Sequence, residues 1–262
     1  MSTYTRESDK KIRVAIAQQR ILPDRDVNIM KGLSLIKRAI QVRADLVVLP
    51  EVFNTGFYTH NYELVENLED ELELILRLSE AKDMVIIAGV AEREEDKLYN
   101  SAAIVYRGEI IGKYRKTHLF PLTSEKKYFT PGNKIEVFDT PIGKVGLLIC
   151  YEIRFPELAR KLAKMGAEII AVPAEFPKER IDHWRVLLQA RAIENQLFVI
   201  GANCVEGDLD YGGRSMLVDP MGKVLIEGGE YQEVMMADID LEDIDFVRSK
   251  YPFLNDLRTE LL

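Results

Sequence analysis

Apolar residues along the chain follow two alternating patterns, one typical of buried strands and the other of amphipathic helices. Short apolar runs, such as residues 46–49 and 84–90, predict strands that are buried on both faces of a sheet. In residues 26–41, by contrast, apolar side chains recur every three or four positions, which predicts a helix. On the same grounds, further strands are expected at 12–18, 98–106, 109–114, 135–138, 144–150, 168–172, 197–203 and 233–237, and further helices at 69–82, 156–165, 181–194 and 241–248.

Several of these strands are joined by short turn sequences rather than by helices. Arg107-Gly108 and the segments 140–143 and 219–222 each predict a hairpin. Hairpins mixed with helical connections predict an α/β fold of mixed sheets with helices on their outer faces. Because no Gly-, Pro- or Ser-rich linker interrupts the pattern, we expect a single domain over 1–262, with a flexible segment at about 1–10 and a C-terminal tail at about 250–262.

Composition excludes several classes of function. The net charge of −8, with no dominant cluster of Lys and Arg, argues against a nucleic-acid partner. No apolar run approaches the roughly 20 residues of a membrane span, and the polar N-terminus lacks the apolar core of a signal peptide. The two cysteines, Cys150 and Cys204, are too few for a disulfide framework. We therefore expect a cytoplasmic protein without a membrane or nucleic-acid partner.

Three reactive side chains follow three separate predicted strands. Glu51 comes after the strand at 46–49, Lys116 after the strand at 109–114, and Cys150 closes the strand at 144–150. Taken singly, they have ordinary interpretations as a loop carboxylate, a surface lysine and a core cysteine. Together they suit nucleophilic attack on a carbonyl group, since a thiol supplies the nucleophile, a carboxylate accepts its proton and an ammonium stabilises an oxyanion. Ligand crevices of α/β sheets lie beyond strand ends, where these residues are placed.

The sequences around these residues resemble the nitrilase superfamily of carbon–nitrogen hydrolases. The resemblance is carried by residues 49–57, 114–120 and 146–157, in the order in which that family has them. Weaker matches follow at 190–196, 202–204, 211–215 and 219–222, so the resemblance covers nearly the whole chain.

The resemblance implies a four-layer α-β-β-α sandwich that forms a homodimer or a higher oligomer and needs no metal or organic cofactor. It implies that Cys150 is the nucleophile and Glu51 the general base and later acid. Lys116 and the backbone N–H of Tyr151 would stabilise the oxyanion. Glu125 fits the position of a second carboxylate that many members have. The C-terminal tail would lie at an oligomer interface.

Residues after the nucleophile favour one branch of the family. Nitrile hydrolysers commonly have Trp where this chain has Tyr151, and carbamoyl-amino-acid hydrolysers often have Asn-Asp instead of Tyr151-Glu152. Residues 150–155 look most like the ω-amidase branch, which implies hydrolysis of small linear amides, including ω-monoamides of dicarboxylic acids, with release of ammonia. A nitrilase, an N-carbamoyl amino acid amidohydrolase, an acyl transferase and a catalytically silent binding scaffold remain alternatives.

Substrate-binding residues are expected near the nucleophile. Arg154 either grips a substrate carboxylate or braces its loop by pairing with Glu152, Glu157 or Glu175. Phe57, Glu175 and Phe176 are expected to line the pocket.

A Cys–His arrangement is the main chemical rival to a Glu–Lys–Cys triad. The chain has His60, His118 and His183. Because His118 is two residues from Lys116, both side chains would point to the same side of an extended segment. They would therefore compete for the same position beside the thiol. We interpret His118 as support for the lysine loop and His183 as a packing or lid contact.

Overall fold

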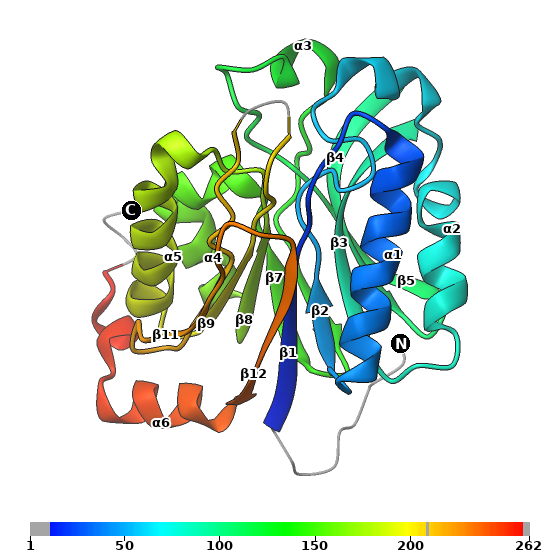
Figure 1. Ribbon diagram of the computed structural model, residues 1–262. Helices are drawn as coiled ribbons and strands as arrows, with labels where there is room; N and C mark the ends of the chain where they lie inside the picture. The colour runs from blue at the N-terminus through cyan, green and yellow to red at the C-terminus, as the bar shows by residue number, and fades with distance from the viewer. Residues whose placement is uncertain (1–10, 208–209, 259–262) are drawn as a thin grey trace.

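Two six-stranded β-sheets pack face to face, and helices cover the outer face of each (Figure 1). The computed structural model describes residues 11–207 and 210–258. The expected four-layer α-β-β-α sandwich of mixed sheets is confirmed. Within the described ranges, no helix combines the length and apolar character that crossing a bilayer requires.

The first sheet is built mainly from the N-terminal half of the chain. Its strands, in spatial order, are β12 (Glu233–Asp240), β1 (Lys11–Gln18), β2 (Leu46–Val48), β3 (Val85–Glu94), β4 (Lys97–Tyr106) and β5 (Glu109–Arg115). The central strands β1, β2 and β3 are parallel, and the remaining pairings are antiparallel. The outer helices are α1 (Arg25–Gln41) and α2 (Leu68–Ser79).

The second sheet repeats this plan with residues from the C-terminal half. Its strands, in spatial order, are β11 (Val224–Glu227), β10 (Met216–Val218), β9 (Phe198–Ala202), β8 (Ile169–Pro173), β7 (Gly143–Leu147) and β6 (Val137–Thr140). Strands β7, β8 and β9 are parallel. Helices α4 (Pro156–Lys164) and α5 (Ile181–Asn195) cover its outer face, and α6 (Glu242–Lys250) follows β12 (Figure 1).

The two outer helices of the first sheet begin at side-chain caps. Asp24 accepts a hydrogen bond from the Val27 N–H at the start of α1, and Asn67 accepts one from the Asp70 N–H at the start of α2. Each cap satisfies a backbone donor that has no partner within its helix. Acidic residues in the first turn of α2 also suit the positive end of the helix dipole, so the local sequence determines where these helices start.

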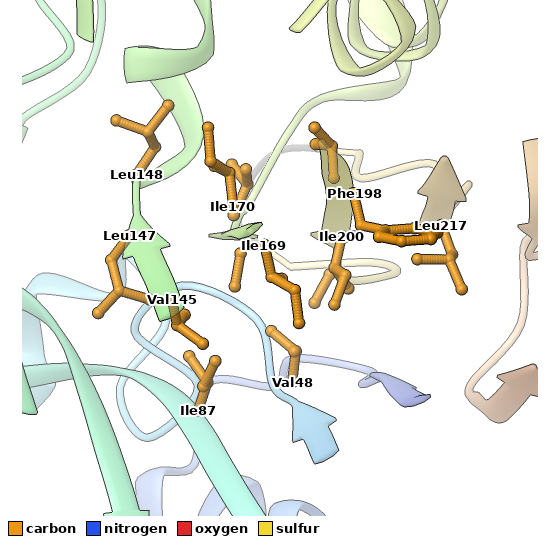
Figure 2. Close-up of a cluster of buried hydrophobic side chains, with 14 of the residues drawn as sticks. Val48, Ile87, Val145, Leu147, Leu148, Ile169, Ile170, Phe198, Ile200 and Leu217 are labelled. Carbon is orange, nitrogen blue, oxygen red and sulfur yellow. The ribbon is translucent and has the colours of Figure 1, made fainter. Parts of the chain in front are cut away.

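Alternation along the buried strands of the first sheet directs their side chains into two layers of the core. Val48 and Ile87 point into the space between the sheets, toward Val145 and Ile169 of the second sheet (Figure 2). Val47, adjacent to Val48, packs instead with residues of α1 and α2. Successive strand side chains point to opposite faces, so a continuous apolar run serves both layers.

Several predicted boundaries were wrong. Strand β3 does not end at residue 90 but continues to Glu94 and turns directly into β4. The strand predicted at 144–150 ends at Leu147, because the backbone turns before Cys150. Short helical turns were not predicted: α3 (Glu125–Tyr128), η1 (Thr59–Leu64), η2 (Cys150–Arg154), η3 (Lys178–Arg180) and η4 (Phe253–Asp256).

The two ends of the chain are only partly described. The segment expected to be flexible, about 1–10, lies outside the described residues, as does 259–262 at the end of the expected tail. The described part of that tail contains η4, where the Phe253 side chain is exposed. The single-domain organisation stays a prediction.

Candidate active site

Glu51 lies in the turn directly after β2, where it is fully buried. A glycine on the neighbouring strand makes this close packing possible. A Cβ atom on Gly89 would lie 2.4 Å from the Pro50 carbonyl oxygen and 2.8 Å from the Cβ of Pro173. The missing side chain therefore lets the Glu51 turn and the end of β8 both approach β3, which brings the two sheets together at this point.

Lys116 follows β5 and lies between two buried carboxylates. Its Nζ atom is 2.7 Å from Glu51 Oε1, 2.8 Å from Glu125 Oε1 and 3.0 Å from Glu125 Oε2. Burial by itself favours the neutral amine, but the charges of Glu125 and Glu51 outweigh it and raise the pKa of Lys116 above its ordinary value. Lys116 is therefore a fixed ammonium ion inside the protein.

Glu125 begins the short helix α3 and joins the loop after Lys116 to this cluster. The Phe120 N–H donates to Glu125 Oε2 at 2.6 Å. Burial raises the pKa of Glu125, the Lys116 charge opposes this, and the Glu51 charge raises it further; the net shift is upward. Glu125 thus holds a proton up to a higher pH than an ordinary glutamate does.

Asn100, on β4, is a site residue that the sequence reasoning missed. Its Nδ2 atom donates to Glu51 Oε1 at 2.7 Å and to Glu125 Oε1 at 2.8 Å, while its backbone carbonyl accepts from the Lys116 N–H at 2.8 Å. One side chain therefore sets the positions of both carboxylates. The available signal was the polar pair Asn100-Ser101 inside an otherwise apolar strand.

Replacement of Asn100 by leucine tests this arrangement, because leucine has a similar size and no N–H. We expect kcat/KM to fall about 10- to 100-fold, since two hydrogen bonds to charged groups are lost at about 1.5–3 kcal/mol each and part of that loss is relieved by rearrangement. The acid limb of the pH–rate profile should move to higher pH, because a carboxylate without its donor is protonated more easily. A lower rate with an unmoved acid limb would argue against a role in holding the carboxylates.

Cys150 lies at the first residue of η2, in a left-handed backbone conformation with φ of 46°. For a residue with a side chain, this conformation costs roughly 1–2 kcal/mol. Its Sγ atom lies 3.6 Å from the carbonyl oxygen of Glu175. Burial and the Glu51 charge raise the pKa of the thiol well above its ordinary value, and Lys116 opposes them only in part. The thiol is therefore protonated at rest and needs a base at the moment of attack.

Glu152 connects the turn of Cys150 to the loop of Lys116. Its Oε1 accepts from the Tyr114 hydroxyl at 2.7 Å, the Thr117 N–H at 2.8 Å and the Thr117 hydroxyl at 2.6 Å. Its Oε2 accepts from the Ile149 N–H at 2.9 Å. Although burial opposes the charged form, these donors and His118 lower the pKa of Glu152. The carboxylate therefore stabilises both loops in its ionised form.

Replacement of Glu152 by glutamine is expected to lower the free energy of unfolding by about 2–3 kcal/mol at pH 7, as hydrogen bonds to a charged group are lost. Because the folded pKa of Glu152 is depressed, its contribution is present above the unfolded pKa and lost as the pH falls. The difference from the unmodified protein should thus shrink below about pH 4. Urea unfolding at pH 7 and below about pH 4 measures this difference in the free energy of unfolding, with the exposed Glu157→Gln as control. Equal differences at the two pH values would contradict the charge argument.

A cavity lies over Cys150 and encloses about 410 Å³, including its open mouth. All the site residues expected from the sequence line it, among them Glu51, Lys116, Glu125 and Cys150. The sequence reasoning missed five further lining residues: Phe120, Thr123, Pro177, Arg180 and Tyr211. Over residues 11–207 and 210–258, no group of three His, Cys, Asp or Glu side chains is arranged to hold a metal ion.

A buried thiol beside an ammonium held by two carboxylates is a site for attack on a carbonyl group. The family model of carbon-nitrogen hydrolases matches residues 13–249. This chain belongs to the carbon-nitrogen hydrolase family.

Curated relatives and solved structures of this hydrolase family agree with that assignment. The 2-oxoglutaramate amidase of Bacillus subtilis is 40% identical over 240 residues, which cover 89% of this chain and 92% of the relative. Omega-amidase NIT2 of Xenopus tropicalis is 34% identical and covers 96% of both chains. The crystal structure of Nit3 of Saccharomyces cerevisiae, a member of branch 10 of the nitrilase superfamily, has a TM-score of 0.86 and 33% identity, and covers 94% of this chain and 95% of that one.

None of the three histidines of this carbon-nitrogen hydrolase, His60, His118 and His183, lines the cavity over Cys150. His118 lies 2.8 Å from the Thr117 hydroxyl and 3.7 Å from Glu152, and its ring packs on Phe155. It lines a separate surface hollow and not the cavity over Cys150. This placement agrees with the interpretation of His118 as support for the lysine loop.

Arg154 does not brace its loop through a carboxylate. Its guanidinium forms no ion pair with Glu152, Glu157 or Glu175, all of which are described residues. It lies 3.4 Å from the His183 ring nitrogen and over the ring of Phe176, at 5.3 Å from the centroid. The guanidinium therefore faces the cavity with its charge uncompensated by these carboxylates.

Proposed function

We propose that this carbon-nitrogen hydrolase cleaves small linear amides through a thioester on Cys150, and that it prefers ω-monoamides of dicarboxylic acids. The observation that carries the proposal is the Cys150 thiol in one buried cavity with an ammonium that is held between Glu51 and Glu125. The 2-oxoglutaramate amidase and omega-amidase names of its relatives support the same reaction and substrate class.

The first step is attack of sulfur on the amide carbonyl. Glu51 accepts the proton of the Cys150 thiol as the S–C bond forms and the C=O π electrons move onto oxygen. The Lys116 ammonium and the backbone N–H of Tyr151 stabilise the negative charge on that oxygen. Removal of one such donor typically costs about 3–4 kcal/mol of transition-state stabilisation.

The second step expels ammonia and regenerates the enzyme. Glu51 donates its proton to the amide nitrogen, the C–N bond breaks and ammonia leaves, so that a thioester remains on Cys150. A water molecule then attacks the thioester and gives its proton to Glu51. The S–C bond breaks, the carboxylic acid is released and the proton returns to sulfur.

Arg154 supports the preference for a substrate with a carboxylate. Five of the side chains that line the cavity with it are aromatic, namely Phe57, Phe120, Tyr151, Phe176 and Tyr211. In such surroundings, a guanidinium binds a carboxylate through two parallel hydrogen bonds more strongly than it would in water.

Ammonia release from a panel of compounds tests the proposal. The panel holds short aliphatic amides, dicarboxylate ω-monoamides, carbamoyl amino acids and aliphatic nitriles, each assayed with the unmodified enzyme and with Cys150→Ala. We expect release from amides, fastest from the ω-monoamides, with one equivalent of acid per ammonia. If less than one equivalent of acid forms per ammonia when an amine is present, the acyl group has been transferred to the amine. Ammonia release only from nitriles or carbamoyl compounds would overturn the substrate class. No Cys150-dependent release would favour a binding scaffold.

The proposal includes a homodimer formed through the outer face of α5. Val186 and Ile193 are 63% and 53% exposed, and they lie seven residues apart on one face of that helix. The opposite face of α5 is buried against the second sheet (Figure 1), so the helix is apolar on two sides. Sedimentation velocity should give a dimer, and Val186→Glu should shift it to a monomer; a monomeric unmodified protein would contradict this part.

A cytoplasmic location is also part of the proposal. Neither Cys150 nor Cys204 forms a disulfide in the structure, which suits a reducing compartment. Detection of the protein in the soluble fraction that contains cytoplasmic marker enzymes tests this location.

A further inference from the structure

Two guanidinium groups line the cavity from different parts of the fold. Arg154 ends η2 and is four residues after Cys150, and Arg180 ends η3 immediately before α5. Arg180 reaches the cavity beside Phe120, and its Cζ atom lies 5.5 Å from the centroid of that ring. The proposed chemistry assigns no role to Arg180.

Arg180 lines an outer hollow as well as the cavity over Cys150, and Arg154 does not line that hollow. The outer hollow adjoins the cavity, is wider and includes Leu122, Lys178 and Asp210. Arg154 lines only the inner cavity of these two. Arg180 therefore lies where the cavity over Cys150 and the outer hollow meet.

Among the residues that the structure describes, the neighbours of Arg180 compensate its charge only weakly. Among the described residues, Arg180 forms an ion pair with Glu179 at 3.4 Å, and the Glu179 side chain is 83% exposed to solvent, whereas that of Arg180 is only 25% exposed. An ion pair with so exposed a partner contributes little. Asp210 lines the outer hollow and Glu175 the inner cavity, and neither forms an ion pair with Arg180.

We propose that Arg180 is a specificity-determining residue that binds the substrate carboxylate and selects acyl chains long enough to place it near the mouth of the cavity. The inference rests on the proposed function. The amide carbon of every substrate must lie at Cys150, so each added methylene moves the carboxylate outward. A short chain then places its carboxylate at Arg154, and a longer chain places it at Arg180, where a guanidinium can bind it through two hydrogen bonds.

Steady-state kinetics with two arginine variants test the proposal. Arg180→Gln and Arg154→Gln are compared on the monoamides of four-, five- and six-carbon dicarboxylic acids and on the uncharged butyramide. For Arg180→Gln we expect KM to rise about tenfold or more on the five- and six-carbon substrates, with less change on the four-carbon substrate and none on butyramide. Arg154→Gln should show the opposite dependence on length. Arg180→Lys should recover part of the loss, since it restores the charge without the planar fork.

A control variant and a binding measurement separate this proposal from the proposed function. Arg185→Gln removes an exposed arginine of α5 that pairs with Glu227 outside the cavity, and it should leave all KM values unchanged. Calorimetry with glutarate and Cys150→Ala should show binding that Arg180→Gln weakens by a similar factor, whether or not amides are hydrolysed.

Three outcomes would overturn the role of Arg180. An equal effect of Arg180→Gln on butyramide and on the charged substrates would indicate a structural role. Unchanged KM values and unchanged glutarate binding would show that Arg180 does not contact the carboxylate. A penalty that does not grow with chain length would refute selection by length. If glutarate binding depends on Arg180 but no amide is hydrolysed, the proposed function fails while the carboxylate site stands.

Discussion

Replacement of Cys150 by alanine is expected to abolish amide hydrolysis, with a fall in kcat of about 10⁵- to 10⁶-fold, because the sulfur that forms the thioester is removed and no neighbouring group replaces it. Stability should change by no more than about 1 kcal/mol, since the substitution removes a single atom that faces the cavity. The φ of 46° at this position is equally strained for cysteine and alanine. Ammonia release and urea unfolding measure the two effects.

The second cysteine provides a matched control. Cys204 is buried in a small cluster with Ile21 and Tyr211 and does not line the cavity. Cys204→Ala should therefore cost about 1–2 kcal/mol of stability through lost packing and keep its activity. A thiol reagent should block activity by modifying Cys150 before it modifies Cys204. Hydrolysis that persists in Cys150→Ala and disappears in Cys204→Ala would refute the assignment of the nucleophile.

Replacement of Lys116 by alanine is expected to lower kcat/KM by at least about 10²- to 10³-fold, the usual effect of removing one oxyanion donor. It should also lower the free energy of unfolding by about 3–5 kcal/mol at pH 7, as removal of one partner from a buried ion pair does. Both effects are large because Glu51 and Glu125 remain fully buried, and each loses a hydrogen bond of 2.7–2.8 Å to the ammonium.

The two effects of Lys116→Ala should separate with pH. Loss of the ammonium removes the group that opposes the raised pKa of Glu125, so that pKa rises further. A carboxyl group with a folded pKa above its unfolded value binds its proton more tightly in the folded protein, and so the stability of the variant should recover as the pH falls. Activity should not recover, since a protonated carboxyl cannot stabilise an oxyanion as Lys116 does.

A neighbouring lysine is the control for this second prediction. Lys113 lies on β5 with a half-exposed side chain, and it pairs with Glu92 at 3.3 Å. Lys113→Ala should change stability by no more than about 1 kcal/mol and leave turnover unchanged. Near-normal turnover of Lys116→Ala would remove Lys116 from the mechanism.

Periodicity predicted most of the elements, because burial on a helix and burial on a strand require different spacings. The helix at 26–41 and the strand at 12–18 differ from the structure by one residue at their first positions. The predictions of elements failed where the backbone departs from a long, regular helix or strand. The strand predicted to reach Cys150 ends at Leu147, and the short helix that begins with Glu125 has too few residues to show a period.

The sequence by itself determined which reactive residues follow strands, and its motifs indicated the family. Only the tertiary structure decided which of them meet. The contact of Lys116 with Glu51 spans 65 residues, and the hydrogen bond from the Glu175 N–H to Glu51 spans 124. Such contacts depend on the packing of two sheets and on single backbone angles at strand ends. A linear pattern of apolar positions encodes neither, which is why Asn100 and Arg180 became visible only in the folded protein.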